Sequence, residues 1–561
     1  MAKICTRIFA TSFLSAFVLS SSIAAQALPN NPDTTISRTI RTVIAATHHP
    51  RMKWPDFPFY KDEMEGLYQP LAFQPFWLVN GQPRPQIRDA VDILLYAETR
   101  GLDPEDYDAS RLDAQARQIQ AGAGFSAEDL ALFDTQLSLA LFRQISDVHI
   151  GKINPKNLKY GINIESKKYF LPELVRASVE KNRLHEMIQE AEPDYPLYRD
   201  FKKALARYRR LAKEATFSPL PAKATVHSGE PYAGLPQLQH WLHALGDLPL
   251  VFSNGDSGIV YQGAIVEAVK KFQSRHGLQA DGVLGKGTFA ALNVPPARRC
   301  RQIEFAMERL RWLPELRDGP FIFVNVTAFR MYAFDSLDAE GMPTLLMDVI
   351  VGKALDTETP VFIENLQYIE FRPYWYVPLN IVRRTVIPAA QKNPAHFLNS
   401  GFEVLRGNNV LGQEVTPEIL SQLESGSLRL RQKPGLANAL GPAKFIFPNN
   451  SNVYIHGTPS RSLFSRARRD LSSGCVRIED PATLSLWVLQ DQPEWNRERI
   501  VKAMEGEQPT RVFLKNPLPV IIFYTTAIVR PSDGTVFFYE DIYQHDKMLE
   551  EALLAGEPYA P

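Results

Sequence analysis

The chain of 561 residues has few of the features that would place it in a specialised structural class. Three cysteines are too few for a disulfide scaffold or a structural zinc module. Its 62 basic residues balance its 62 acidic ones, which argues against a protein that binds nucleic acid by neutralising phosphates. The longest late apolar run, Val520 to Val529, is too short to span a membrane and rich in strand-forming residues. The length predicts about three or four globular domains.

The N-terminus has the pattern of a removable export signal. Lys3 and Arg7 precede an apolar run from Ile8 to Leu19, and Ala25-Gln26-Ala27 then forms a cleavage site of the A-x-A kind. We therefore predict a signal peptide over residues 1–27, an exported mature protein and no transmembrane anchor after cleavage. An uncleaved N-terminal anchor is the alternative.

Residues 36–215 predict a helical scaffold domain. Ser126 to Asp129 form a capping box, and an apolar stripe with spacings of three and four follows. The stripe consists of Leu130, Phe133, Leu137, Leu141 and Ile145. No chemical motif occurs in this region, so we interpret it as a structural support. A linker rich in Pro, Gly and Ser, from Thr216 to Pro236, then marks a boundary.

Residues 235–295 predict a small domain of three helices. A helix near Tyr261 to His276 is stopped by Gly277, and a glycine turn around Asp281-Gly282 precedes a third short helix. This order of Phe272-Gln273, His276-Gly277-Leu278, Asp281-Gly282, Gly285, Thr288 and Ala291-Leu292 resembles the peptidoglycan-binding domain of many wall enzymes. The stretch from Gly246 to Gly258 departs from that pattern as an insertion, which leaves glycan binding open.

Residues 321–543 predict a β-rich domain, so the fold class is multidomain α+β. The strand rhythm is interrupted from 379 to about 443, which we interpret as an inserted lid of helix and loop. Pro373 and Pro378 bracket an aromatic cluster that includes Trp375, and they should prevent ladder pairing there. A β-hairpin is predicted at the end, from Val520 to Val529 and from Thr535 to Tyr543.

A histidine and a cysteine in this β-rich region suggest nucleophilic catalysis. Cys475 lies in Ser473-Gly474-Cys475-Val476-Arg477, nineteen positions after His456. A free thiol has a pKa of about 8.5, so an imidazole that takes its proton and leaves a thiolate–imidazolium pair would activate it. Gly474 lets the backbone approach a substrate carbonyl, the Cys475 N–H can donate to an oxyanion, and Arg477 adds a positive charge.

Each of these residues also has a structural interpretation when taken alone. Cys475 could be an inert buried thiol, His456 a satisfied core histidine, and Arg466, Arg468 and Arg469 a solvated basic turn. The shared spacing of cysteine, glycine and arginine favours a nucleophile and its base. Cys300 has no such neighbours, and we interpret it as structural.

At these residues the chain resembles the L,D-transpeptidases with a YkuD-type catalytic domain, in particular the large periplasmic members of Gram-negative bacteria. The matching segments are Gly352-Lys353, Thr359 to Phe362, Pro373 to Trp375, Val377-Pro378, Lys444-Phe445, Phe447 to Asn449, His456 and Ser473 to Arg477. The resemblance implies that Cys475 is acylated, that His456 is its general base and that the Gly457 carbonyl orients the imidazole. It also implies that Arg477, Trp375 and Tyr454 contact substrate, and that no metal or organic cofactor is used.

Two positions depart from the family pattern. Gly457 stands where an acidic residue is frequent, so orientation of His456 would depend on the main chain. Ser473 stands where many relatives have histidine. Neither change removes the predicted pair of Cys475 and His456.

The resemblance implies a peptidoglycan transpeptidase of the periplasm that joins tetrapeptide stems, as donor and acceptor, through 3→3 cross-links. A cysteine thioester would form with release of D-Ala, and carbapenems would acylate the same sulfur. Two alternatives stay open: an L,D-carboxypeptidase with water as acceptor, and a non-catalytic wall-binding scaffold. A papain-like peptidase fits least, because the sequence around Cys475 and the order of His before Cys differ.

Overall fold

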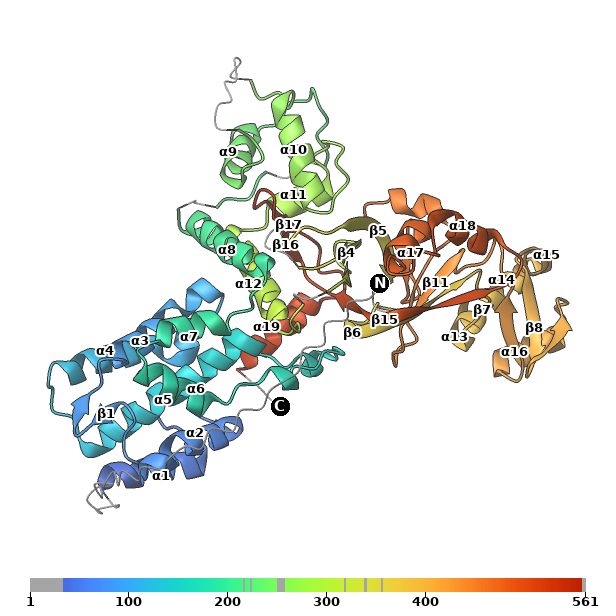
Figure 1. The fold of residues 1–561 in the computed structure, drawn as a ribbon. Coiled ribbons are helices and arrows are strands. Elements are labelled where there is room, and N and C mark those ends of the chain that lie inside the picture. Colours follow the sequence, from blue (N-terminus) through green and yellow to red (C-terminus); the bar gives the residue numbers. More distant parts are fainter. Residues whose placement is uncertain are drawn as a thin grey trace, which may run out of the picture.

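The computed structural model describes residues 34–214, 217–221, 224–249, 258–316, 319–337, 341–354 and 357–556. The predicted signal peptide, residues 1–27, lies outside this part of the chain. Figure 1 shows a helical region at one end, a small helical unit beside the middle, and a β-rich region that extends to the other end. Within the described residues, no helix combines the length and apolarity needed to cross a bilayer.

The N-terminal region is a bundle of helices built around one central helix. Its helices are α1 (Thr35–Ala46), α2 (Lys61–Tyr68), α3 (Ile87–Leu95), α4 (Ala109–Gln120), α5 (Ala127–Ile150), α6 (Leu171–Glu180) and α7 (Leu184–Ala191), with a small hairpin of β1 (Leu78–Val79) and β2 (Gln82–Pro83). Helix α8 (Pro196–Glu214) follows the bundle and packs in a separate apolar core. Helix α5 begins at Ser126, whose side chain accepts a hydrogen bond from the Asp129 N–H. The predicted stripe understates its burial, because most of α5 is enclosed on every side.

The small helical unit contains α9 (Leu235–Leu245), α10 (Ala264–Arg275) and α11 (Lys286–Leu292) around its own apolar core. The Gln273 side chain joins α10 to the following turn: it donates to Asp281, Val283 and Thr288 and accepts from the Gly282 N–H. Part of the predicted insertion, residues 250–257, lies outside the described residues. Helix α12 (Pro296–Arg311) follows and packs against α8.

The C-terminal region contains a nine-stranded sheet that closes on itself. Its order is β13-β5-β14-β12-β11-β6-β15-β3-β4, and β4 also pairs with β5. The strands are β3 (Phe321–Asn325), β4 (Arg330–Phe334), β5 (Leu345–Gly352), β6 (Phe362–Phe371), β11 (Ala443–Ile446), β12 (Ile455–His456), β13 (Asp470–Ser472), β14 (Val476–Ile478) and β15 (Thr510–Phe523). Closure gives a barrel-like core and leaves few free strand edges. The predicted α+β class is confirmed.

The insertion from 379 to about 443 contains helices, as predicted, but also three strands. Its elements are α13 (Leu379–Ile381), a π-helical turn (Val382–Val386), α14 (Ile387–Lys392), α15 (Pro394–Asn399), β8 (Phe402–Arg406), β9 (Asn409–Gly412), α16 (Pro417–Ser425) and β10 (Arg429–Gln432). With β7 (Trp375–Tyr376) they form a second sheet, in the order β7-β10-β8-β9. In Figure 1 this insertion lies at the end of the β-rich region farthest from the helical bundle.

Two expectations about strand pairing were wrong. Trp375 and Tyr376 do pair, opposite Gln432 and Arg431, because β7 is an edge strand, where flanking prolines cost no central ladder bond. The C-terminal hairpin is shorter than predicted: only β16 (Ala527–Val529) and β17 (Val536–Phe538) pair across the turn, while residues 520–523 belong to β15. The remaining helices are α17 (Pro481–Val488), α18 (Arg497–Glu505) and α19 (His545–Ala555).

Candidate active site

A row of polar side chains crosses five strands of the large sheet. The strand register pairs Arg477 with His456, His456 with Lys444, Lys444 with Glu370, and Glu370 with Arg511. Directly paired residues project from the same face of a sheet, so these side chains lie side by side on one face. We call this set the charged row. The alternate positions on the same strands, including Ile455 and Val476, are buried in the core.

Cys475 and Tyr454 lie on the same face as the charged row, one step along the strands. Cys475 precedes Val476 at the start of β14, and Tyr454 precedes Ile455 at the start of β12. The Val476 N–H donates to the Tyr454 carbonyl at 3.1 Å, which extends the pairing of β12 and β14 toward these residues. The sheet therefore brings the predicted nucleophile and the predicted base to one face, although they are far apart in sequence.

His456 is held by the main chain around Gly457. The side chain is 5% exposed, and its Nδ1 lies 2.5 Å from the Gly457 carbonyl oxygen. A carbonyl can only accept, so Nδ1 carries the proton and Nε2 is left as the basic nitrogen. Gly457 has no room for a side chain, because a Cβ there would lie 2.9 Å from Pro442 and 3.2 Å from Pro481. The contact orients the imidazole through the main chain, without an acidic side chain.

The loop before Cys475 is fixed by contacts to two segments that match the family pattern, Gly352-Lys353 and Thr359-Pro360. Gly474 has a φ of +107°, and its carbonyl accepts from the Thr359 hydroxyl at 2.8 Å. The Ser472 hydroxyl donates to the Cys475 carbonyl at 2.6 Å, and the Ser472 carbonyl accepts from the Lys353 N–H. The Gly352-Lys353 and Thr359-Pro360 segments thus support the Cys475 loop from one side.

The main-chain donors near Cys475 differ in availability. The Gly474 N–H already donates to the Ser472 hydroxyl at 3.2 Å, so it serves the loop and not a substrate oxygen. The Cys475 N–H has no hydrogen-bond partner among the described residues. Of the two, the Cys475 N–H is the one that remains open to an oxyanion.

Burial sets the charge state of the pair. Burial raises the pKa of the Cys475 thiol. Hydrogen bonds from the Tyr454 backbone and hydroxyl, together with the charge of Lys444, act in the opposite direction. Burial, followed by the charge of Arg477, lowers the pKa of His456 to about 3; Lys444 acts in the same direction. Burial therefore favours the neutral form of both groups, and the thiolate–imidazolium pair that activation of the thiol would create stays a prediction. No hydrogen bond joins the His456 ring to the Cys475 sulfur within the described residues, so proton transfer requires the two side chains to come closer.

The remaining predicted site residues lie around this pair. Arg477 is half-buried, and its Nε has no hydrogen-bond partner in the described part of the chain. The Trp375 indole lies within hydrogen-bonding reach of the Tyr454 hydroxyl. Trp375 belongs to β7, so the second sheet contacts the site through this residue.

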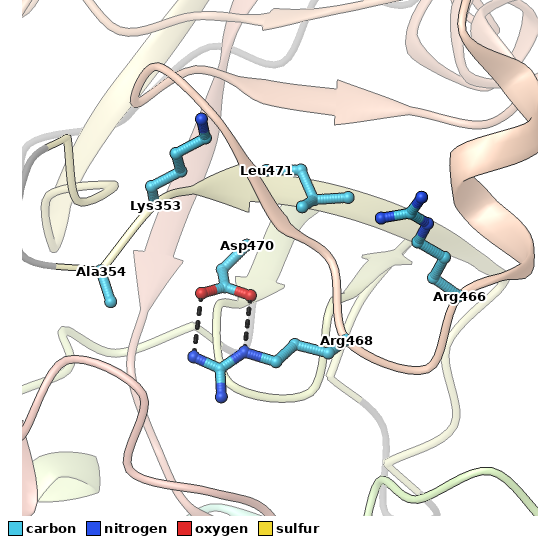
Figure 2. A pocket seen from close by; sticks show the side chains of 6 residues that line it. All are labelled: Lys353, Ala354, Arg466, Arg468, Asp470 and Leu471. Carbon is cyan, nitrogen blue, oxygen red and sulfur yellow. Dashed lines mark hydrogen bonds and ion pairs between the residues drawn. The ribbon is translucent and has the colours of Figure 1, made fainter.

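The three arginines of the 466–469 segment have separate roles. Arg469 is buried and binds Asp348 and several main-chain carbonyls, which is a structural role. Arg468 forms a two-bond ion pair with Asp470, drawn in Figure 2, and also contacts Glu540. A basic surface hollow contains Arg466 and Arg468; its lining residues are Lys353, Ala354, Arg466, Arg468, Asp470 and Leu471. The hollow includes neither His456 nor Cys475.

Cys300 is structural in character. It is 6% exposed in α12, it forms no disulfide, and burial raises the pKa of its thiol to about 11. The sequence indicated Lys444 only as part of a segment that matches the family, and its position beside His456 was not predicted. The alternation in Ala443-Lys444-Phe445-Ile446, with Ala443 and Phe445 buried, could have placed it on the site face.

Three segments of the chain match known protein families. Residues 319–521 match the family described as "L,D-transpeptidase catalytic domain", the YkuD family, and they include the whole charged row, His456 and Cys475. The chain has a YkuD-type L,D-transpeptidase catalytic domain. Residues 62–205 match the family described as "Scaffold domain", and residues 232–292 match "Putative peptidoglycan binding domain". The three segments occur in the predicted order.

Two individual proteins are similar to parts of the chain. A Haemophilus influenzae protein named "Putative L,D-transpeptidase" is 29% identical over 247 residues, which cover 44% of this chain and 48% of that protein. The match therefore spans about half the length of that relative. A crystal structure of an L,D-transpeptidase from Xylanimonas cellulosilytica is 16% identical, covers 54% of this chain and 99% of its own, and has a TM-score of 0.16.

Proposed function

We propose that the protein is a peptidoglycan L,D-transpeptidase that forms 3→3 cross-links through a thioester on Cys475. The observation that carries the proposal is the shared sheet face, inside the YkuD-type domain, of Cys475 and of His456, whose Nδ1 faces the Gly457 carbonyl so that Nε2 is the basic nitrogen. The half-buried thiol, the fixed loop around it and the nearby cations support the same assignment. The catalytic residues of the proposal are Cys475 and His456, with the Gly457 carbonyl holding the imidazole.

In the first half-reaction the sulfur attacks a donor tetrapeptide stem. The bond attacked lies between a diamino acid at the third position, such as meso-diaminopimelate, and the terminal D-Ala. The thiol proton passes to His456 Nε2 as the S–C bond forms, because a neutral imidazole can accept it and a buried thiolate is costly beforehand. The Cys475 N–H donates to the developing oxyanion. Collapse breaks the C–N bond, and His456 returns the proton to the D-Ala amine.

In the second half-reaction an amine of another stem attacks the thioester. His456 takes the amine proton, the new amide forms, and the sulfur leaves and recovers a proton from His456. A covalent intermediate holds the acyl group while the products and substrates exchange. The insertion from 379 to about 443 pairs through β10 with β7, whose Trp375 lies near the site, and closure of the insertion would favour the amine over water.

The other parts of the chain fit an exported wall enzyme. Arg477, Tyr454 and Trp375 are proposed substrate contacts, and the Gly474 turn lets substrate approach the sulfur. The proposed domains are the scaffold at 36–215, the wall-binding unit at 235–295 and the catalytic domain at 321–543. With the signal peptide at 1–27, they support a periplasmic location in a Gram-negative cell, and the segment similar to peptidoglycan-binding domains would bring the enzyme to its polymer.

Product analysis with purified disaccharide-tetrapeptide tests the proposal. We expect cross-linked dimers that have lost one D-Ala per cross-link, and none from Cys475→Ala. Cys300→Ala is the matched control and should keep full activity. Free tripeptide without dimer would instead identify an L,D-carboxypeptidase. No conversion by a folded protein would favour the non-catalytic scaffold.

A further inference from the structure

The charged row contains an ammonium group that the proposed mechanism does not use. Lys444, on β11, is paired in register with His456 on one side and with Glu370 on the other. Its Nζ lies 3.7 Å from the centre of the Tyr454 ring. An ammonium over an aromatic face is attracted by the ring, which fixes its position. Lys444 thus lies against the residue that contacts the Cys475 sulfur.

Lys444 has no carboxylate within ion-pair distance among the described residues. Glu370, its neighbour on β6, is instead paired with Arg511, whose Nε lies 3.2 Å from a Glu370 oxygen. Half-buried cations are ordinarily compensated by an acid, because burying a charge without a partner is costly. Glu370 therefore acts on Lys444 without a direct ion pair, which leaves the ammonium available to an anion that develops nearby.

The Cys475 sulfur is the group on this face that can become such an anion. The groups that face it are His456 and Tyr454 from β12, Lys444 from β11 and Arg477 from β14. His456 is held neutral, so it does not balance a negative sulfur before it takes the proton. Lys444 and Arg477 are the permanent positive charges that act on the sulfur. Lys444 also packs on the ring of Tyr454, whose hydroxyl contacts the sulfur.

We propose that Lys444 is a positioning residue for Cys475: it fixes Tyr454 against the sulfur and supplies the positive charge that stabilises the sulfur when it becomes negative. This inference rests on the proposed function, because it assumes that Cys475 is the nucleophile. It adds a role for a residue outside the Cys–His pair and explains why no carboxylate forms a direct ion pair with Lys444. The role is electrostatic, so it needs no contact with the substrate.

The rate of Cys475 alkylation by iodoacetamide, measured between pH 6 and pH 10 by mass spectrometry of the Cys475 peptide, tests the proposal. The thiolate attacks the CH₂ carbon and iodide leaves, so the rate reports the thiolate fraction without any wall substrate. Lys444→Gln should slow alkylation about tenfold at pH 7 and move the midpoint up by roughly one pH unit. Lys444→Arg keeps the charge and should stay within about threefold of the wild type.

A second variant gives a change of opposite sign. Glu370→Gln removes the acid on the far side of Lys444, so the positive potential rises and alkylation should become about two- to threefold faster. It remains informative if Lys444→Gln does not fold. Equal rates within twofold at every pH for the wild type and for whichever of Lys444→Gln and Glu370→Gln folds would overturn the proposal. A Lys444 effect with no cross-linking activity in the wild type would leave Lys444's role intact and refute the transpeptidase.

Discussion

The helical bundle and the charged row differ in whether their buried charged groups have direct polar partners. In the bundle, Asp134 is fully buried, and its carboxylate accepts from the Tyr68 hydroxyl and from the N–H groups of Phe76 and Trp77 at 2.7–2.9 Å. In the charged row, Lys444 and Arg477 have no ion-pair partner among the described residues. A charge with a complete set of partners fixes the fold, whereas a charge left open near a thiol is available to an anion.

Removing the sulfur should have the largest effect. Cys475→Ala takes away the proposed nucleophile, so cross-linking should fall by at least about 10³-fold while the fold is kept, because the site is half-buried and alanine fits the same loop. Timed product analysis gives the rate, and circular dichroism checks the fold. Retention of more than a tenth of wild-type activity would show that Cys475 is not required for cross-linking, and the proposed catalytic role of the charged row would then be wrong.

Removing the bundle's buried carboxylate should affect stability instead of chemistry. Asp134→Ala leaves the Tyr68 hydroxyl and two backbone N–H groups without their acceptor, which should destabilise the bundle by about 3 kcal/mol. Hydrogen exchange in α5 measures the loss. Cys475 alkylation should be unchanged in the same protein, and a parallel fall in alkylation would show that the two regions are coupled.

Low pH should change the stability of the two regions to different extents. The pKa of His456 is lowered to about 3 by burial, followed by the charge of Arg477, against 6.5 when unfolded. The unfolded chain binds the extra proton, so stability at the site falls as the pH drops below 6.5, by at most about 2 kcal/mol at pH 5. In the bundle, burial raises the pKa of Asp147 to about 7 and that of Asp134 to about 6, so both favour the folded state as pH falls.

Other groups in the bundle oppose this trend, because burial lowers the pKa of His49 to about 4 and also lowers that of His149, while ion pairs and hydrogen bonds lower the pKa of Asp106, Asp113 and Asp129. Asp134 and Asp147 both lie buried on α5, so we expect α5 to be less sensitive to acid than the site. Hydrogen exchange at pH 7 and pH 5, corrected for intrinsic rates, should show protection lost in β12 and β14 before α5. Earlier loss in α5 would contradict the comparison.

Arg477 should give the smallest of these effects. Arg477→Gln removes one of the open cations but leaves Lys444, so Cys475 alkylation at pH 7 should fall about tenfold or less. The same variant removes a cation that lowers the pKa of His456, so the acid sensitivity of β12 should decrease. An unchanged acid response would show that burial alone holds His456 neutral.

Local pattern predicted much of the fold and the position of the site. The Ser126 cap, the α5 stripe and the turn after Gly277 are set by neighbouring residues, so the sequence identified them. Strands β8, β9 and β10 were missed, because short strands among helices have no sustained alternation. The pairing of β7 was missed because it depends on β10, more than fifty residues later in the chain, and on being at an edge.

In the site, too, local motifs could be predicted from the sequence, whereas features that depend on long-range pairing could not. The motif around Cys475 and the position of His456 could be recognised from the sequence, since both are short and specific. The charge states could not, because they depend on burial and on Lys444 and Arg477, which the sheet register brings to either side of His456. Register is a long-range property, so the surroundings that shift the pKa values of His456 and Cys475 could not be predicted from local pattern.

Intact-mass analysis of the mature protein with a carbapenem tests most directly whether Cys475 is the acylated nucleophile. We predict one adduct per chain, mapped by peptide analysis to Cys475, with none on the buried Cys300 and none in Cys475→Ala. The adduct should form in Cys300→Ala as in the wild type. A folded protein that gains no adduct, or that carries it on any residue other than Cys475, would contradict the account.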